Sequence, residues 1–194
     1  MTARGNGLGE AGHHEEALSV KEAELAMERR VGADEDDLLL TQGNLANSYA
    51  KLGRDEALGM RQEVYSGYLE LKGEEDDGTL WAALNYALNL KELHRFEEAK
   101  ALLRKTIPVA RRVLGESDQD TLRLRCIYAE ALYADANATL DDLREAMDTF
   151  EDADRIARRV FGGANPLVLY IERDLRAARA ALRAREEPPP PGTE

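Results

Sequence analysis

The sequence predicts an all-α fold, a right-handed superhelical solenoid built from antiparallel helix pairs. Glycines that end predicted helices recur at a nearly fixed period, at Gly32, Gly73, Gly115 and Gly162. An entry motif ending in alanine recurs with them, as Glu15-Glu16-Ala17, Asp55-Glu56-Ala57, Glu97-Glu98-Ala99 and Arg144-Glu145-Ala146. A second motif recurs between these copies, as Asn44-Leu45-Ala46, Asn85-Tyr86-Ala87 and, more loosely, Ile127-Tyr128-Ala129. Self-similarity at a period of about 20–50 residues is typical of a solenoid, in which each helical pair covers the next.

The clearest copy lies between Asp76 and Gly115. Apolar residues recur every three or four positions from Thr79 to Leu93 and again from Phe96 to Leu114, which predicts two amphipathic helices. The short junction at Leu93-His94-Arg95 folds the second helix back on the first.

The same frame divides the whole chain. We expect a flexible segment at 1–12, a repeat domain of helix pairs at 13–185 and a disordered proline-rich tail at 186–194. The domain consists of a half repeat at 13–33, repeats at 34–74, 75–116 and 117–163, and a capping helix at 164–185. The expected helices are 13–31, 34–52, 55–72, 79–93, 96–114, 120–134, 140–161 and 165–185.

The first helix lacks a partner on its N-terminal side. Ala17, Leu18, Leu25 and Ala26 lie on one side of it, and we expect the first three to be only half covered. Such a patch favours self-association or an N-terminal segment folded over it. At the other end, the arginine series from Arg173 to Arg185 is either the polar face of a cap or a docking strip for an acidic partner.

Three of the second helices carry unusual residues. Gly59 and Gly67 predict that the helix at 55–72 is the softest element. Pro108 predicts a kink within a helix that continues beyond it. Thr139 followed by Asp142 predicts a capping box at the start of the longest helix. In that helix we expect these residues to face inward: Leu140, Leu143, Met147, Phe150, Ala153, Ile156, Ala157 and Val160.

Acidic runs precede two of the first helices, at Asp34-Glu35-Asp36-Asp37 and Glu74-Glu75-Asp76-Asp77. Carboxylates at a helix N-terminus oppose the positive end of the helix dipole and offer a cap. A calcium loop needs a glycine at its sixth position and a glutamate at its twelfth, a pattern that both runs lack. We therefore expect capping and no metal site.

Composition excludes several classes of partner. A formal net charge of −12 argues against nucleic acid and against an anionic membrane surface, because both need a basic excess. The lone Cys126 excludes an internal disulfide and favours a packing role. We find no run of 18 apolar residues and no signal segment, so we expect a soluble, cytoplasmic protein.

The sequence offers no enzyme constellation. It lacks a phosphate-binding glycine loop, a C-x-x-C pair and an H-E-x-x-H motif, and its three histidines leave a nucleophile–base pair hard to place. We expect a non-enzymatic protein without a cofactor. An enzyme that uses the acidic turns as a metal site is the remote alternative.

The repeat residues resemble the tetratricopeptide family, in the form with repeats of about 42 residues found in kinesin light chains. The resemblance rests on Ala46, Ala87 and Ala129 in the first helices, on the junction from His94 to Ala99, and on Val113-Leu114-Gly115. It covers roughly residues 8 to 185. The family's G-x-x-H-P-x-T linker is present only in outline, with Asp76 and Asp118 at the histidine position.

The resemblance implies a protein–protein interaction scaffold, a kinesin-light-chain-like adaptor that binds a linear peptide or a partner protein in its concave groove. Asparagines of the first helices often hold the peptide backbone in this family, and Asn44 and Asn85 match them, whereas Ile127 departs. The predicted groove residues are Asn44, Asn47, Lys51, Trp81, Asn85, Leu88 and Arg123, with Lys91 and Glu130 beside them. The net negative charge predicts basic or neutral peptides.

Two alternatives stay open at this point. The asparagines can instead cap or pair locally within the stack. The chain can also be a structural segment of a larger repeat assembly, or a homo-oligomer, with no function for a peptide groove. The heptad coiled coil through which kinesin light chains join the motor is absent, as is the lysine and arginine set that clamps a peptide carboxylate in the chaperone-binding members.

Overall fold

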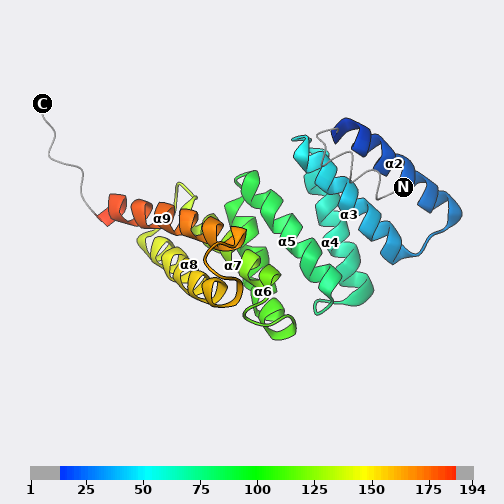
Figure 1. Cartoon of the computed structure of the whole chain (residues 1–194). Helices are drawn as coiled ribbons and strands as arrows, with labels where there is room; N and C mark the ends of the chain where they lie inside the picture. Colours follow the sequence, from blue (N-terminus) through cyan, green and yellow to red (C-terminus); the bar gives the residue numbers. More distant parts are fainter. Residues whose placement is uncertain (1–13, 187–194) are drawn as a thin grey trace, which may run out of the picture. The chain divides into compact units, whose positions relative to one another are not determined.

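A computed structural model describes residues 14–186 of the chain (Figure 1). The predictions for 1–12 and for the tail beyond Glu186 lie outside the described residues. The described part consists of eight α-helices joined by short turns. They are α2 (His14–Val31), α3 (Glu35–Lys51), α4 (Glu56–Lys72), α5 (Asp77–Glu92), α6 (Phe96–Val113), α7 (Gln119–Tyr133), α8 (Leu140–Phe161) and α9 (Pro166–Glu186). Every expected helix is present, with ends within two residues of the prediction.

The chain divides at α5 into two compact units, Met1–Asn89 and Leu90–Glu194. In the N-terminal unit, α3 packs between α2 and α4. Two apolar clusters hold these helices together. Leu18, Leu25 and Leu45 form the first, against Tyr49 and Met60 among others. The second cluster joins α3, α4 and α5 and consists of Leu39, Val64, Tyr68 and Ala82.

In the C-terminal unit, α7 packs on both α6 and α8, and α9 packs on α8 and, to a lesser extent, on α7. Figure 1 shows α8 and α9 running alongside each other. Phe150 on α8 is fully buried, and its ring lies 6.0 Å from that of Tyr133. Leu122, Leu124 and Leu132 supply the apolar face of α7 and are also fully buried.

The periodic residues occupy the positions that the repeat requires. Ala46, Ala87 and Ala129 are each 0% exposed, so the small side chain lets the neighbouring helices approach. Gly32, Gly73, Gly115 and Gly162 all have φ between 71° and 97°, a region that glycine enters without a steric penalty. His94 also has positive φ, at 57°, in the turn where the preceding repeat has Gly53.

The first helices begin with two kinds of N-terminus. Asp76 accepts hydrogen bonds from the backbone N–H groups of Gly78 and Thr79, at 2.8 and 3.2 Å, so its acidic run provides the expected cap. Asp118 makes the same pair of bonds at the start of α7. At α3, the run from Asp34 places acidic residues in the first turn as expected, but the Asp34 side chain makes no capping hydrogen bond.

The second helices confirm two predictions. Thr139 and Asp142 form a capping box at the start of α8. The helix α6 continues through Pro108 to Val113, which excludes a break there. Next to the proline, the Thr106 hydroxyl donates to the Leu102 carbonyl at 3.0 Å.

Some burial predictions are wrong. Ala17, Leu18 and Leu25 are 1–4% exposed and not half covered, because α3 and α4 supply Leu45 and Met60 against them. Ala26 is exposed. Leu140 and Val160 are 38% and 47% exposed. These two residues lie in the terminal turns of α8, where fewer neighbouring residues surround the helix.

Candidate functional site on the first helices

The first helices α3 and α5 of the N-terminal unit carry six of the seven predicted groove residues. We call the surface formed by their half-buried and exposed polar positions the first-helix face. Asn44 on α3 and Asn85 on α5 occupy equivalent repeat positions, each two residues before the buried alanine, and both are half-buried. Their side chains are therefore close enough to solvent to meet a ligand and close enough to the core to be held in place.

A basic side chain from the preceding helix fixes the backbone at both asparagines. Lys21 on α2 donates to the Asn44 carbonyl at 3.2 Å and to the Ser48 hydroxyl at 2.9 Å. Arg61 on α4 donates to the Asn85 carbonyl at 2.9 Å. We call Lys21 and Arg61 the basic latches. Each is only 6% exposed. Burial and the nearby Lys51 charge lower the pKa of Lys21.

The two asparagine carboxamides differ in what they bind. The Asn85 amide donates to the Trp81 carbonyl, one turn back, at 2.9 Å. No hydrogen bond joins the Asn44 carboxamide to another group in the described residues 14–186. Asn44 thus retains its full side-chain hydrogen-bonding capacity, whereas Asn85 uses one donor locally, as the alternative of local pairing expects.

Trp81 packs against the apolar core with part of its side chain and exposes the rest to solvent. Its ring lies against the cluster of Leu39, Val64, Tyr68 and Ala82 and remains half-buried. It crosses α3 at Gly43, where an added Cβ would lie 2.7 Å from the Cη2 atom of Trp81. The glycine is therefore needed for the tryptophan to reach this place, and the indole reports directly on the contact between α3 and α5.

The other groove candidates of this unit surround the asparagines. Asn47 is half-buried, and its carboxamide oxygen accepts from the Arg61 guanidinium at 3.0 Å. Lys51 is exposed near the end of α3, and Leu88 is half-buried on α5. The N-terminal unit thus brings a carboxamide pair, a cation and an apolar side chain onto helices that pack together.

The remaining candidates belong to the C-terminal unit. Arg123 is exposed on α7 and lies 3.4 Å from the Asp120 carboxylate. Lys91 and Glu130 pair with each other at 2.9 Å. Burial raises the pKa of Glu130, although Lys91 opposes the shift. Both groups of this pair are already occupied, so Arg123 is the more accessible of the three.

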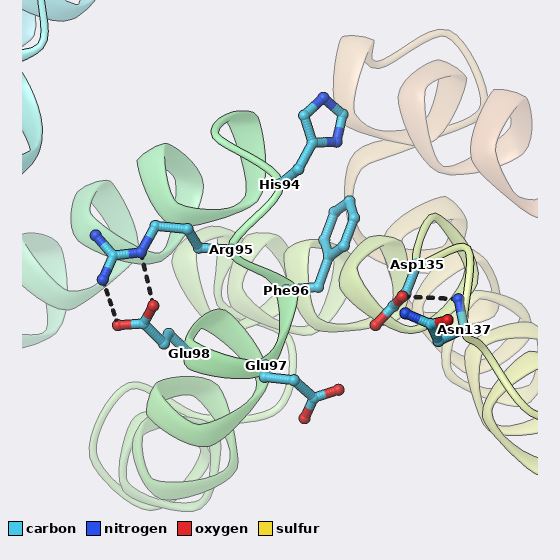
Figure 2. A pocket seen from close by; sticks show the side chains of 7 residues that line it. All are labelled: His94, Arg95, Phe96, Glu97, Glu98, Asp135 and Asn137. Carbon is cyan, nitrogen blue, oxygen red and sulfur yellow. Dashed lines mark hydrogen bonds and ion pairs between the residues drawn. The ribbon is translucent and has the colours of Figure 1, made fainter.

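A pocket of about 260 Å³ lies beside the turn between α5 and α6 (Figure 2). Figure 2 shows Arg95 and Glu98 paired on one side, Asp135 and Asn137 on the other, and the Phe96 ring between them. Buried Lys100 lies 2.5 Å from Glu97 and 3.6 Å from Asp135. The cations Arg95 and Lys100 around this pocket already pair with its carboxylates.

Reactive chemistry is sparse in the part of the chain that the structure describes. Among residues 14–186 no cluster of histidine, cysteine and carboxylate groups could hold a metal ion. Cys126 is fully buried, and burial raises the pKa of its thiol far above the usual range, which leaves it unreactive. No described helix is both long and apolar enough to span a membrane.

The family model for the tetratricopeptide repeat matches residues 37–112, from α3 to the end of α6. This part of the chain is therefore built of tetratricopeptide repeats. The matched segment includes the basic latch Arg61, both asparagines and Trp81. Repeats of this fold generally serve as scaffolds for protein–protein interaction. No curated protein matches the chain.

Solved structures show the same fold. Two crystal structures of kinesin light chain nearly identical TPR-like repeats from Podosopora anserina, the first of them a point variant, give TM-scores of 0.80 and 0.78. Each is 20% identical, with 95% of this chain and 86% of that chain covered. BtubC (BKLC) from P. vanneervenii gives a TM-score of 0.71 at 20% identity, covering 98% of this chain and 82% of its own. The fold is therefore that of kinesin-light-chain-like repeats.

The structure adds residues that sequence reasoning missed. Lys21 and Arg61 were not predicted as part of the site, although each stands four residues after the repeated alanine, at Ala17 and Ala57. The cap that Asp118 forms was missed as well, because no acidic run surrounds it. Its spacing of one repeat from Asp76, at the histidine position of the family linker, was the signal.

Proposed function

We propose that this tetratricopeptide-repeat protein is a non-enzymatic, cytoplasmic scaffold that binds a linear peptide or a partner segment along its first helices, in the manner of a kinesin-light-chain-like adaptor. The contact residues that we propose on the N-terminal unit are Asn44, Asn47, Lys51, Trp81, Asn85 and Leu88. Arg123 on α7 of the C-terminal unit is proposed as a separate contact residue. The observation that carries the proposal is the half-buried Asn44 carboxamide, which has no partner among the described residues and stands on a helix held by a basic latch.

The polar groups suit a peptide backbone. A carboxamide offers one acceptor and two donors, so Asn44 can pair with both the N–H and the C=O of an extended residue without choosing its side chain. Asn85 keeps its oxygen and one amide proton for the same purpose. The basic latches support this geometry. Lys21 donates to the backbone carbonyl of Asn44 and Arg61 to that of Asn85, so each latch fixes the backbone that carries the asparagine side chain.

Charge supports a preference in the ligand. The chain carries a net charge of −12, and its acidic surface attracts basic peptides over distances comparable to the Debye length, about 8 Å at physiological salt. We therefore propose basic or neutral peptides as the preferred class. Affinity for basic peptides should fall as salt rises, whereas affinity for neutral ones should hardly change.

A peptide array followed by titration calorimetry tests the proposal. An array of basic, neutral and acidic peptides selects a ligand, and Asn44→Ala and Asn85→Ala are then titrated with it. Loss of a hydrogen bond of about 1 kcal/mol predicts a weakening of about fivefold at Asn44, with a smaller loss at Asn85. Asn137→Ala, an exposed asparagine of the C-terminal unit, is the matched control. Equal affinity of all three variants and the wild type would exclude these asparagines as contacts.

Exposed apolar residues favour a second candidate, a structural role in self-association through the N-terminal half repeat or in a larger repeat assembly. Met27 and Val31 on α2 are 52% and 65% exposed. The polar side chains of Glu15, Glu16 and Glu22 are exposed on the same helix. Light scattering as a function of concentration separates the two candidates. A dimer that Val31→Glu dissociates supports the structural role, and a monomer at all concentrations excludes self-association.

A further inference from the structure

A second pocket, of about 270 Å³, lies among α6, α7 and α8 of the C-terminal unit. Arg104 and Arg111 line it from α6, Arg125 and Tyr128 from α7, and Glu145 from α8. None of these residues is a proposed peptide contact. The pocket is smaller than the range of about 300–1,000 Å³ usual for drug-sized ligands, so it suits a single small group.

One guanidinium nitrogen in this pocket has no hydrogen-bond acceptor among residues 14–186. Arg125 is 6% exposed. Its Nη2 atom donates to the Asp152 carboxylate at 2.5 Å. Its Nη1 atom is buried without a hydrogen-bond partner, and the Glu116 Oε2 atom lies 3.8 Å away. Buried donors are paired in the great majority of cases, so an acceptor from outside the described residues is expected here.

Arg104 adds a second available cation. Its Nε atom donates to the Tyr128 hydroxyl at 3.2 Å, and its guanidinium lies 5.7 Å from the centre of the Tyr128 ring. Within residues 14–186, no carboxylate forms an ion pair with it. The tyrosine hydroxyl in turn donates to Glu145 at 2.8 Å. Tyr128 thus orients the guanidinium and leaves its outer N–H groups for another acceptor.

The charge of the lining is opposite to that of the chain. Three guanidinium groups line the pocket against one carboxylate, Glu145, in a protein of net charge −12. Glu116 and Asp152 lie outside the lining, where they pair with Arg111 and Arg125 at 2.7 and 2.5 Å. Guanidinium groups present several N–H donors in a planar fork that matches phosphate and carboxylate oxygens.

From this arrangement we infer that the pocket among α6, α7 and α8 binds an oxyanion, a phosphate or carboxylate group, between the guanidinium groups of Arg104 and Arg125. The Arg111 side chain, which is more exposed than that of Arg125, attracts the anion at long range. The oxyanion supplies the acceptor that Nη1 of Arg125 lacks. This inference does not depend on the proposed peptide function, because its residues are different and its ligand is small.

Titration of the full chain with inorganic phosphate, and separately with acetate at the same ionic strength, tests the inference by calorimetry. We expect saturable binding at one site. Tighter binding of phosphate assigns the site to phosphoryl groups, and binding of acetate at least as tight assigns it to carboxylates. Saturable binding of neither anion would overturn the inference and leave water as the partner of Nη1.

Three exposed variants make the test specific, because none removes a buried side chain. Arg104→Gln should weaken the bound anion about tenfold, through loss of charged hydrogen bonds. Glu145→Gln should strengthen binding, since it removes the opposing carboxylate. Arg179→Gln, on α9 and paired with Glu151, removes the same charge elsewhere and should leave affinity unchanged. Equal weakening by Arg104→Gln and Arg179→Gln would show a general charge effect and overturn the site.

Discussion

The two units fill the same repeat position with opposite chemistry. Four residues after the repeated alanine of each second helix, the N-terminal unit has Lys21 and Arg61, and the C-terminal unit has Leu103 and Phe150. All four are buried, at 6%, 6%, 0% and 0% exposure. The asparagine position of the first helices differs in the same way. It holds Asn44 and Asn85 in the N-terminal unit and Ile127 in the C-terminal unit.

The difference shows how one repeat supports two kinds of inner surface. A buried cation needs acceptors, and the N-terminal unit provides the asparagine carbonyls, which keeps polar groups at its first helices. The C-terminal unit has apolar side chains both at the latch position and, with Ile127, at the asparagine position, and these side chains pack without hydrogen bonds. We therefore place the peptide contacts mainly on the N-terminal unit, and we expect the C-terminal unit to be the more rigid.

The largest effect should separate the latch from its apolar counterpart. Phe150→Ala removes a fully buried ring and should lower the free energy of unfolding by about 3–5 kcal/mol. Arg61→Met keeps volume at the latch but leaves the Asn85 carbonyl and the Asn47 carboxamide oxygen without this donor, so we expect a smaller loss of about 1–3 kcal/mol. Urea denaturation measures both. Equal losses would contradict the distinction between a polar latch and an apolar core position.

Two glycines of α4 sharpen the account of the N-terminal unit. An added Cβ at Gly67 would lie 2.5 Å from the Leu39 Cδ2 atom, whereas nothing lies within 4 Å of one at Gly59. Gly67→Ala should destabilise the fold by about 1–3 kcal/mol through overpacking. Gly59→Ala should stabilise it by about 0.4–1 kcal/mol, because it restricts the unfolded chain. If thermal denaturation gives stability changes of the same sign for both variants, the described packing of α3 on α4 is wrong.

The helix caps test a smaller difference between the units. Asp118 caps α7 with two hydrogen bonds, whereas Asp34 makes none at α3. Asp118→Ala should lower the free energy of unfolding by about 1 kcal/mol. Asp34→Ala should lower it by only about 0.3 kcal/mol, the contribution of the helix dipole. A larger loss at Asp34 than at Asp118 would reverse the assignment.

The smallest effect depends on pH. The Thr139 hydroxyl and backbone N–H both donate to Asp142 and hold the pKa of that carboxyl below its ordinary value. Such a carboxyl stabilises the fold above its unfolded pKa, about 3.9, and loses this contribution as the pH falls through its lower folded pKa. The stability difference between wild type and Asp142→Ala, about 0.5–1 kcal/mol at pH 7, should therefore shrink at acidic pH.

Sequence periodicity predicted most of the fold, because each repeat places its small and apolar residues at the same register. Ala46, Ala87 and Ala129 are completely buried as expected. The pattern failed where local neighbours decide burial. Leu140 and Val160 continue the apolar period of α8 yet lie in its exposed terminal turns.

The candidate site was less predictable. Asn44 and Asn85 follow from the repeat register, but their different hydrogen bonds do not, since only the packed structure shows that Asn85 bonds the Trp81 carbonyl. The role of Lys21 and Arg61 was hidden because a charged residue in an amphipathic helix is normally expected at the surface. The contact of Trp81 with Gly43 joins two helices and has no signature within either one.

Trp81 provides the most direct test of the central claim, that the first helices of the N-terminal unit hold the peptide. It is the single tryptophan of the chain and lies half-buried, with its ring beside Gly43 of α3. Titration with the array-selected peptide should change its fluorescence saturably, with the same dissociation constant as calorimetry, and Asn44→Ala should shift that curve to higher peptide concentration. A peptide that binds by calorimetry while the Trp81 emission stays constant, with Asn44→Ala binding as tightly as wild type, would contradict the claim.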